Sequence, residues 1–509
     1  MKPKSAILSV LSMLSLTLST PAADYDGRYL DLVKKSADAL LANAVDHYGE
    51  KQTALIISVL DATTGKPLER TEKTINGEVK KVLPPLPNGI RSYDRVAEYG
   101  SNASLQVDLY RVLQELSRLT GDARYADAAR EALLDLFRVT QHPDTGLLAW
   151  GEHTWWDCLA DAVATNMKNT HEPKRAFGYF DLVYQVEPER MLRYARGLWD
   201  HQIANKKTGD FSRHATYDKH GPRNGFDFPK EGGFFINTWA RAYEKSQAPE
   251  FLTAVSVLAN RYLGRTNERG LLDWDSTRHG TCVPLWLESL AIEADDAVAR
   301  VDEPTAALLK KLVAAQDQGF LGLKHDPAGR GFICNAVTAS GEPLPRPERK
   351  SDGWSQPWGL GYGSYTTVMF ALLANTRQQQ LGGGEQAGQY RKLLLQAADL
   401  YHTAKPDSQK DLWVCEYGMV IGLEVAAWRL TGKAEYLDTA KWYGDEAVKI
   451  FWGAGADGKQ IPGVLPRASV RATYYDAITY PDTLLLALLA LHEACAGLDG
   501  KVPVSDTIR

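Results

Sequence analysis

The sequence predicts an all-α protein: an (α/α) toroid or barrel of six to seven helical hairpins, with minor β-hairpin additions. Three observations lead to this prediction. Most of the chain shows helical periodicity interrupted by short polar loops, and one helix–turn–helix phrase occurs twice. The polar loops between hairpins are long on one side and short on the other. Such hairpins can stack as an open solenoid, but we favour a closed ring because closure removes the exposed ends of the stack.

The N-terminus has the pattern of a secretory signal peptide. Lys2 and Lys4 precede the apolar run Ala6–Leu18, which small residues follow. This run is too short to span a bilayer, and no later segment is long and apolar enough to do so. We therefore assign residues 1–22 to the signal and residues 23–509 to a single (α/α) barrel catalytic domain. The expected location is periplasmic or secreted, with no membrane span.

Composition argues against some partners and leaves others open. The formal net charge of −5 and the lack of a basic stripe argue against nucleic acid. Five cysteines without a CxxC pair allow one or two disulfides but do not suggest a disulfide scaffold. The 13 tryptophans and 23 tyrosines suit either a large aromatic core or a sugar-like ligand.

The N-terminal elements alternate between helix and hairpin signals. Tyr29–Val45 is amphipathic, which is typical of a helix packed on a core. Thr53–Leu86 contains a TTGKP turn and the charged alternation INGEVKK, which predicts a β-hairpin. Helical periodicity returns at Ser104–Leu119 and, after a Thr-Gly stop, at Asp122–Val139. Further helical runs are expected at Pro188–His201, Gly233–Lys245, Pro249–Leu263, Pro284–Ala297, Pro304–Gln316, Tyr365–Asn375, Gln389–His402, Met419–Leu430 and Tyr480–Ala496.

One phrase repeats between successive helices. LTGDARYADAA at Leu119–Ala129 returns as LTGKAEYLDTA at Leu430–Ala440. Each predicts a helix end closed by glycine, a short turn, and a new helix whose tyrosine packs back. The glycine-rich segment Gln378–Gly384 is expected to be a surface loop inside the domain, because no Pro/Ser-rich linker divides the chain.

Three polar loops carry the candidate chemistry. They are WGEHTWW with His153, NTHEPKR with Glu172, and FSRHATYDKH with Arg213 and His214. Two imidazoles and one carboxylate form a nitrogen and oxygen ligand set that suits Mn, Zn, Fe or Ni better than Mg or Ca. Three protein ligands would leave open positions for a substrate.

These loops resemble those of the periplasmic pectate lyases of polysaccharide lyase family two, the exopolygalacturonate lyase group. That family carries a Gly-His in a FYWGGH-like loop, a His-Glu in a VHELK-like segment and a Ser-Arg-His loop. The counterparts here are Glu152-His153, His171-Glu172 and Ser212-Arg213-His214, with His153 and Glu172 separated by 19 residues. The similarity is strongest over Gly146–Gly221. Glu152 stands where the family has glycine, so a sister family with another uronate substrate is the alternative.

The resemblance implies a fold, a reaction and roles for residues. It implies an (α/α) barrel, with His153, Glu172 and His214 holding a divalent metal and Arg213 acting as the base. Mn²⁺ is the favoured ion, with Ni²⁺, Ca²⁺ and Zn²⁺ as alternatives. Arg213 could instead clamp a substrate carboxylate, since guanidinium pairs bidentately with carboxylates. Tyr217 is the second candidate for proton transfer.

The implied reaction is β-elimination from an acidic polysaccharide or oligosaccharide. A uronate lyase removes the proton at C5, next to a carboxylate, and expels the oxygen on C4. A cation on that carboxylate stabilises the enolate-like intermediate. Arginine is an unusual base because its pKa lies above about 12 in water. Desolvation and a neighbouring positive charge could lower that pKa.

Several basic and aromatic residues are candidates for substrate binding, although packing in the core or solvated surface positions would explain them as well. The candidates are Lys174, Arg175, Trp155, Arg278, His279, Trp354 and Tyr475, with Trp156, Trp358 and Tyr362 as further aromatic residues.

Two other functions remain open from the sequence. A six-hairpin glycoside hydrolase or unsaturated-uronyl hydrolase would need an acidic pair. Asp157, Asp161, Asp210 and Asp275 are the available carboxylates, and none has a distinctive setting. A non-catalytic sugar-binding protein could present the same aromatic-lined mouth.

Overall fold

The computed structural model describes residues 25–166, 170–219, 227–273, 283–347, 351–361, 364–453 and 463–507. The expected signal peptide, residues 1–22, lies outside the described residues. Within this part of the chain no helix is long and apolar enough to cross a bilayer.

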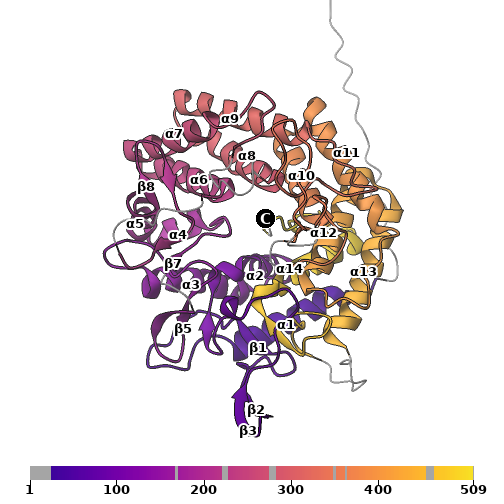
Figure 1. The fold of residues 1–509 in the computed structure, drawn as a ribbon. Helices are drawn as coiled ribbons and strands as arrows, with labels where there is room; N and C mark the ends of the chain where they lie inside the picture. Colours follow the sequence, from indigo (N-terminus) through magenta and orange to yellow (C-terminus); the bar gives the residue numbers. More distant parts are fainter. Residues whose placement is uncertain are drawn as a thin grey trace, which may run out of the picture.

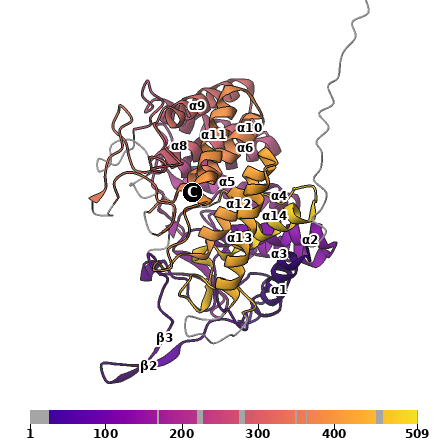
Figure 2. The same ribbon diagram turned by 90° about the vertical axis from the view of Figure 1, so that its right-hand side faces the viewer.

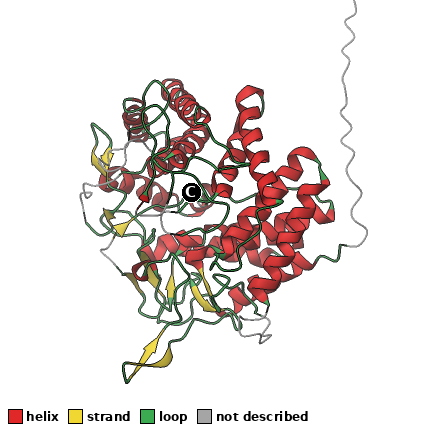
Figure 3. Cartoon of the chain, turned by 45° about the vertical axis from the view of Figure 1, so that its right-hand side comes forward, coloured by secondary structure: helices red, strands yellow, loops and turns green. Residues whose placement is uncertain are grey.

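The helices form two concentric rings (Figure 1), and Figure 3 shows that helices dominate the structure. The inner ring consists of α2 (Val107–Thr120), α4 (Phe180–Val186), α6 (Pro229–Ser246), α8 (Pro284–Val298), α10 (Thr367–Leu381), α12 (Val414–Thr431) and α14 (Pro481–Ala496). The outer ring consists of α1 (Arg28–Asn43), α3 (Ala123–Thr140), α5 (Pro188–Gly197), α7 (Pro249–Leu263), α9 (Glu303–Leu321), α11 (Gly384–Tyr401) and α13 (Ala434–Trp452).

Contacts between helices close the ring. Each inner helix from α2 to α12 packs against the outer helix that follows it in the chain. The last inner helix, α14, packs against both α2 and α1, so the two ends of the chain complete a seventh pair. The predicted (α/α) toroid of six to seven hairpins is therefore confirmed.

Burial follows the two rings. Every residue of α14 from Pro481 to Cys495 is buried, because an inner helix has neighbours on all sides. In the outer helix α13 the buried residues instead follow one stripe with a spacing of three or four: Tyr436, Ala440, Tyr443, Ala447 and Phe451. The difference between the two helices is the expected signature of fully buried and amphipathic positions.

The repeated phrase forms the same turn twice. Helix α2 ends at Thr120 and α12 ends at Thr431, and in each case the next residue is a glycine. Gly121 has φ 74° and Gly432 has φ 69°, the left-handed conformation that closes a helix. The tyrosine that follows in each phrase is buried, as predicted.

The strands are short additions to the rings. The predicted β-hairpin is present only in part: β2 (Thr71–Ile75) pairs with β3 (Glu78–Val82) and projects from the ring (Figure 2). Upstream, β1 (Val59–Asp61) pairs instead with the distant β11 (Tyr474–Asp476). The remaining strands are β4 (Gly100–Ser101), β5 (Thr154–Asp157), β6 (Ala162–Thr165), β7 (Thr170–His171), β8 (Ile203–Asn205), β9 (Asp210–Phe211) and β10 (Ala215–Thr216).

Two further predictions can be compared with the structure. The segment Gln378–Gly384 is only partly a loop, because α10 continues to Leu381. The described cysteines, Cys158, Cys334, Cys415 and Cys495, are buried and unpaired, so none of these four forms a disulfide with another.

Candidate metal centre and active site

Strand pairing brings Glu172 and His214 together. The two-residue strands β7 and β10 are antiparallel, with His171 opposite Ala215. Glu172 follows His171 and His214 precedes Ala215, so these two residues face each other at the next position of the ladder. A separation of more than forty residues along the chain thus becomes a direct contact.

The loop that carries His153 reaches the same place because Gly151 allows a close approach. Gly151 has φ 140°, and a Cβ there would lie 2.7 Å from the carbonyl oxygen of Glu172. The amide of Glu172 donates to the carbonyl oxygen of Trp150 at 3.1 Å. Asn102 and Ser104 both donate side-chain hydrogen bonds to the Gly151 carbonyl oxygen. Only glycine fits this backbone position.

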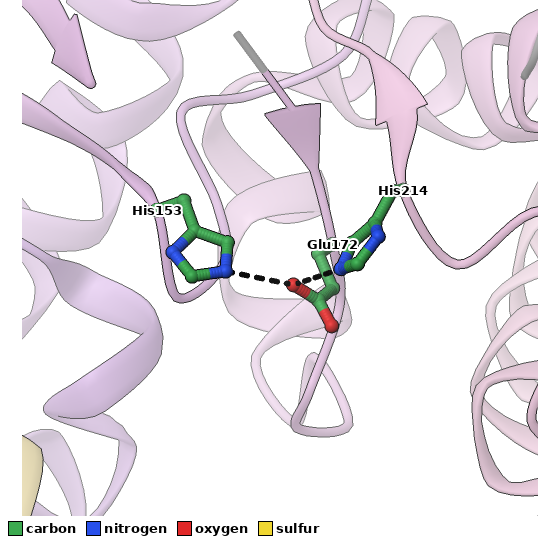
Figure 4. Close-up of side chains that lie close together, drawn as sticks. All are labelled: His153, Glu172 and His214. Carbon is green, nitrogen blue, oxygen red and sulfur yellow. Dashed lines mark ion pairs between the residues drawn. The ribbon is translucent and has the colours of Figure 1, made fainter. Parts of the chain in front are cut away.

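His153, Glu172 and His214 converge on one point (Figure 4). Glu172 Oε2 lies 3.1 Å from His214 Nε2 and 3.8 Å from His153 Nε2. The Glu172 side chain is fully buried and His153 is 3% exposed, whereas His214 is 31% exposed. Part of the His214 ring is therefore the portion of the cluster that reaches solvent.

The donor atoms of this cluster fit a cation. Glu172 Oε2 and His214 Nε2 are buried, lie 3.1 Å apart, and have no other hydrogen-bond partner among the described groups. A bound ion would offset the desolvation cost of these two buried atoms. The set of two imidazoles and one carboxylate matches what borderline divalent metals prefer.

Charged side chains surround the buried carboxylate. Arg213 Nη1 donates to Glu172 Oε1 at 2.7 Å, and its guanidinium carbon lies 4.4 Å from the centre of the Phe228 ring. Lys174 Nζ lies 4.0 Å from the same Glu172 oxygen. Arg213 therefore lies beside the cluster, because it binds the oxygen of Glu172 that does not face the two histidines.

These neighbours control the protonation of the cluster. Burial would raise the pKa of Glu172, but Lys174, Arg213 and His214 outweigh it and lower the pKa far below its usual value. Burial lowers the pKa of His153, against the opposing effect of Glu152 and Glu172. Glu172 is therefore ionised and His153 is neutral, which are the forms that bind metals.

A second acidic group adjoins the first, and sequence reasoning missed it. Asp94, Glu152 and His153 also lie close enough to share an ion. Glu152 Oε2 lies 3.4 Å from His153 Nε2 and accepts from Lys174 Nζ. Arg91 donates to both oxygens of Asp94, at 2.6 and 2.8 Å. The adjacency of Glu152 to His153 in the sequence was the one available signal.

A network of buried polar side chains connects the segment that carries Glu172 with the segment that carries His214. His171 Nδ1 lies 3.0 Å from Gln202 Oε1, and its Nε2 lies 3.2 Å from the Tyr194 hydroxyl. Gln202 also donates to the carbonyl oxygen of Ser212 at 2.6 Å. Gln202 belongs to a single π-helical turn, Leu198–Gln202, and such turns are frequent at functional sites. The turn therefore links the Glu172 and His214 segments.

The N-terminus of α6 adds two more titratable groups that the sequence did not reveal. Burial lowers the pKa of Lys230 to about 7, and burial raises the pKa of Glu231 to about 7. The positive charges of Arg175, Lys174 and Arg213 also lower the pKa of Lys230. Lys230 therefore lies near the basic residues of the site. Both oxygens of Glu231 are buried and make no hydrogen bond within the described residues.

Three predicted site residues are placed in the core, and their assignments are corrected here. The Tyr217 hydroxyl donates to the carbonyl oxygen of Thr140, so it is not directed at the metal cluster. Trp155 is 4% exposed and packs against Gly100. Tyr475 is fully buried and donates to Asp482 at 2.8 Å. Side chains enclosed in this way have no surface to offer a substrate.

Of the other substrate-binding candidates, Arg175 and Trp354 are buried, and Arg278 and His279 are not described. Arg175 is nearly buried, with its guanidinium carbon 4.5 Å from the centre of the Tyr480 ring. Trp354 is 9% exposed and lies under Arg330, at 4.4 Å from the guanidinium carbon to the ring centre. Arg278 and His279 lie outside the described residues.

The carboxylates considered for a hydrolase are used locally. Asp157 accepts from the amides of the turn that follows it, and Asp161 accepts from the amides of Glu50 and Lys51. Asp210 is paired with Arg261. Asp275 lies outside the described part of the chain. None of the three described carboxylates belongs to either cluster that could hold an ion.

Comparisons with known proteins agree with the fold, and the segment that matches a family contains the candidate site. Residues 91–258 match the family described as periplasmic pectate lyase, and this segment contains both acidic clusters. A stretch of 122 residues is 28% identical to the pectate disaccharide-lyase of Dickeya dadantii (strain 3937), over 23% of this chain and 22% of that protein. The chain therefore spans about a fifth of the length of this curated relative. The resemblance to the pectate lyase family is confirmed over the matched segment.

Solved structures show the fold alone. The α-1,2-mannosidase from Trichoderma reesei is similar with a TM-score of 0.50 and 11% identity, over 92% of this chain and 94% of that chain. A cellobiose 2-epimerase from Bacillus thermoamylovorans gives a TM-score of 0.47 and 9% identity, over 91% and 99% of the two chains.

Proposed function

We propose that this protein is a metal-dependent lyase that cleaves polygalacturonate, or another uronate-containing polysaccharide or oligosaccharide, by β-elimination. One observation carries the proposal. His153, Glu172 and His214 come from three separate loops and meet at a buried point, with Arg213 bound to the second oxygen of Glu172. The match of residues 91–258 to periplasmic pectate lyases supports it.

The residues of the site have separate proposed roles in binding and proton transfer. When bound, the divalent ion supplies Lewis-acid stabilisation of the charge that develops on the substrate carboxylate. Lys174 lies on the Glu152 side of the cluster and adds positive charge there for an acidic sugar. The side of His214, the most exposed member of the cluster, is the proposed side of substrate entry.

Arg213 is the proposed base that takes the C5 proton. Its guanidinium is oriented by Glu172 on one side and by the Phe228 ring on the other. This orientation brings a nitrogen to the edge of the ion cluster, where the carboxylate of a substrate would bind the ion. A guanidinium in this place could instead clamp that carboxylate.

Kinetics of Arg213 variants distinguish the two roles. If Arg213 is the base, Arg213→Ala lowers kcat by about 10²–10⁴-fold with little change in KM. If Arg213 is a clamp, KM rises and Arg213→Lys restores part of the loss. A matched control is Arg70→Lys, which alters a guanidinium that is paired with Glu98 outside both clusters.

The lyase activity itself is tested with purified protein. Polygalacturonate and Mn²⁺ should produce the ultraviolet absorbance of an unsaturated uronate product, and His153→Ala should abolish it. Silence on pectate, alginate, ulvan and glucuronan, with Mn²⁺, Ni²⁺ or Ca²⁺ added in turn, would refute the proposal. Product analysis excludes a hydrolase, because hydrolysis creates no double bond.

We also propose a periplasmic or secreted location. The signal-like N-terminus and the description of the matching family support this location. Fractionation of cells that produce the full chain would test it: the mature protein should begin after residue 22 and appear outside the cytoplasm.

A further inference from the structure

Tyr93 is an exposed aromatic residue beside the ion cluster. Among the Phe, Tyr and Trp side chains of the described residues, only Tyr93 and Trp442 are exposed, each at 40%. The centre of the Tyr93 ring lies 6.2 Å from that of the His153 ring, whereas Trp442 belongs to the outer helix α13. Aromatic side chains are common in the walls of sites that bind small ligands. The place of Tyr93, next to the candidate active site, therefore points to contact with a ligand.

The turn that carries Tyr93 is fixed to the rest of the site. Tyr93 is the central residue of the short 3₁₀ turn Ser92–Asp94, and Asp94 is buried. Asp94 accepts hydrogen bonds from Arg91 at 2.6 and 2.8 Å. Asp94 Oδ1 also lies 3.8 Å from His153 Nδ1. The position of Tyr93 is therefore tied to that of His153 through its neighbour in the chain.

Arg91 orients the ring of Tyr93. The guanidinium carbon of Arg91 lies 4.4 Å from the centre of that ring. The same guanidinium is held by Asp94, and its Nη2 lies 3.7 Å from Glu152 Oε2. A ring that packs on a fixed group loses little conformational freedom when a ligand covers its exposed part, so the ring is preorganised for binding.

The ligand that suits this surface is a sugar ring. A pyranose ring can pack its C–H groups on an aromatic face and keep its hydroxyl groups in water. The charges nearby are already paired, Arg91 with Asp94. Lys174 is paired with Glu152 in the same way. Recognition at Tyr93 therefore depends on packing of the ring rather than on charge.

We propose that Tyr93 is a substrate-binding residue, and that its ring packs against the sugar unit next to the uronate whose carboxylate binds the ion. The inference rests on the proposed function for the place of that uronate. Tyr93 neither holds the ion nor transfers a proton. Its contact with the chain is the same before and during the reaction, so loss of the contact raises KM and leaves kcat unchanged.

Kinetics on polygalacturonate test this contact. Tyr93→Ala should raise KM by about 3–10-fold with kcat unchanged, which is the effect expected for one aromatic contact. Tyr93→Phe keeps the ring and should retain the wild-type KM. Trp442→Ala is the matched control, because it removes an equally exposed ring from an outer helix and should change neither constant. An unchanged KM in Tyr93→Ala, or an equal rise in Tyr93→Phe or Trp442→Ala, would overturn the proposal.

Titration calorimetry gives a second readout that does not depend on turnover. In Mn²⁺-loaded Arg213→Ala protein, Tyr93→Ala should weaken the binding of trigalacturonate by the same factor. Mn²⁺ alone should bind metal-free protein equally well with and without the Tyr93 substitution. A fall in Mn²⁺ affinity would mean that Tyr93 only supports His153, and the proposal would fail.

The outcomes separate failure of this inference from failure of the proposed function. If the wild type forms the unsaturated product and Tyr93→Ala has the wild-type KM, only the role of Tyr93 fails. If the wild type acts on none of the four polymers, the lyase proposal fails. Weaker binding of trigalacturonate by Tyr93→Ala would still support a sugar contact at this ring in that case, and equal binding would refute it.

Discussion

At Gly151 the conformation of one backbone residue decides whether two loops can meet. Its φ of 140° is in the region that side chains rarely adopt, and the Glu172 backbone fills the space where a Cβ would be. The glycine therefore has two separate reasons to be there: conformation and close approach.

We expect Gly151→Ala to displace the Glu172 segment and to cost about 1–3 kcal/mol of unfolding free energy. Mn²⁺ affinity should fall as well, because His153 and Glu172 would separate. Urea unfolding and calorimetry measure the two effects. Gly121→Ala is the matched control: its φ is 74° but nothing lies within 4 Å of the added Cβ. That control should lose some stability and keep Mn²⁺ affinity.

Asp482 shows how a single buried carboxyl can make stability depend on pH. Burial raises the pKa of Asp482 to about 8, against the hydrogen bond from Tyr475. Its unfolded value is about 4. Because the folded state holds the proton more tightly, this contribution to stability is fully present below pH 4 and is lost as the pH rises towards 8.

Replacement of Asp482 by asparagine should remove this dependence. From pH 5 to pH 8, the unfolding free energy of Asp482→Asn should rise relative to that of the wild type by more than about 1 kcal/mol. This follows because a tenfold change in a proton-binding equilibrium corresponds to about 1.4 kcal/mol. Urea unfolding at the two pH values gives the comparison. A stability difference that stays constant across this range would contradict the assignment.

Some residues of the candidate site could be predicted from the sequence and others could not. His153, Glu172, Arg213 and His214 could be predicted, because each belongs to a short motif that keeps its residue types in order. Asp94, Arg91 and Lys230 could not, since they reach the site through packing between distant segments. Tyr475 was misassigned because an aromatic residue in a polar loop looks the same whether its hydroxyl meets a sugar or a buried carboxyl.

Among the elements, the hairpin of β2 and β3 contributes least to the core. Its ten strand residues are all exposed except Val82, which is half-buried. The turn residues Asn76 and Gly77 have φ values of 53° and 83°, which suits a tight two-residue hairpin turn. The hairpin is thus held by its own ladder and turn rather than by burial.

Replacing residues 71–82 with a short Gly-Ser linker should therefore change the unfolding free energy by less than about 0.5 kcal/mol. Leu60→Ala in the neighbouring strand β1 is the contrast. Leu60 is fully buried, and its truncation should cost about 2–5 kcal/mol. Denaturant unfolding of both variants makes the comparison, and a large loss in the linker variant would show that the hairpin packs against something.

Elements with local signals could be predicted best. The glycine-closed turns after Thr120 and Thr431 depend on neighbouring residues, and the sequence contains all of them. The pairing of β1 with β11 joins residues more than 400 positions apart, so no local pattern could reveal it. The strands β7 and β10 are also separated along the chain. Only the family resemblance therefore predicted that the residues of the candidate site would lie together.

At the scale of the whole molecule, the C-terminal tail fastens the ring where α14 meets α2. Ser505 and Thr507 donate to Asp108 Oδ2 at 2.6 and 3.1 Å. The amide of Val502 donates to the buried Glu493 Oε2 at 2.7 Å. Asp108 lies on α2 and Glu493 on α14, so one segment satisfies a buried carboxylate on each side of the seam.

Truncation after Gly500 should remove three hydrogen bonds to these carboxylates, although Asp108 keeps the bond from Thr483 and Glu493 keeps the bond from Arg118. Because a hydrogen bond to a charged group contributes about 1.5–3 kcal/mol, we expect a loss of at least about 2 kcal/mol. Truncation after Thr507 is the control and should have no effect. Urea unfolding of the two shortened proteins tests this, and equal stability would mean that the ring closes without the tail.

The position of that tail also bears on how the protein can be handled in the laboratory. The described residues of the tail, up to Thr507, lie among contacts that hold the seam. An affinity tag or fluorescent fusion attached there would compete with the fastening itself. The Asn76-Gly77 turn, which projects away from the rings in Figure 2, offers a safer point of attachment.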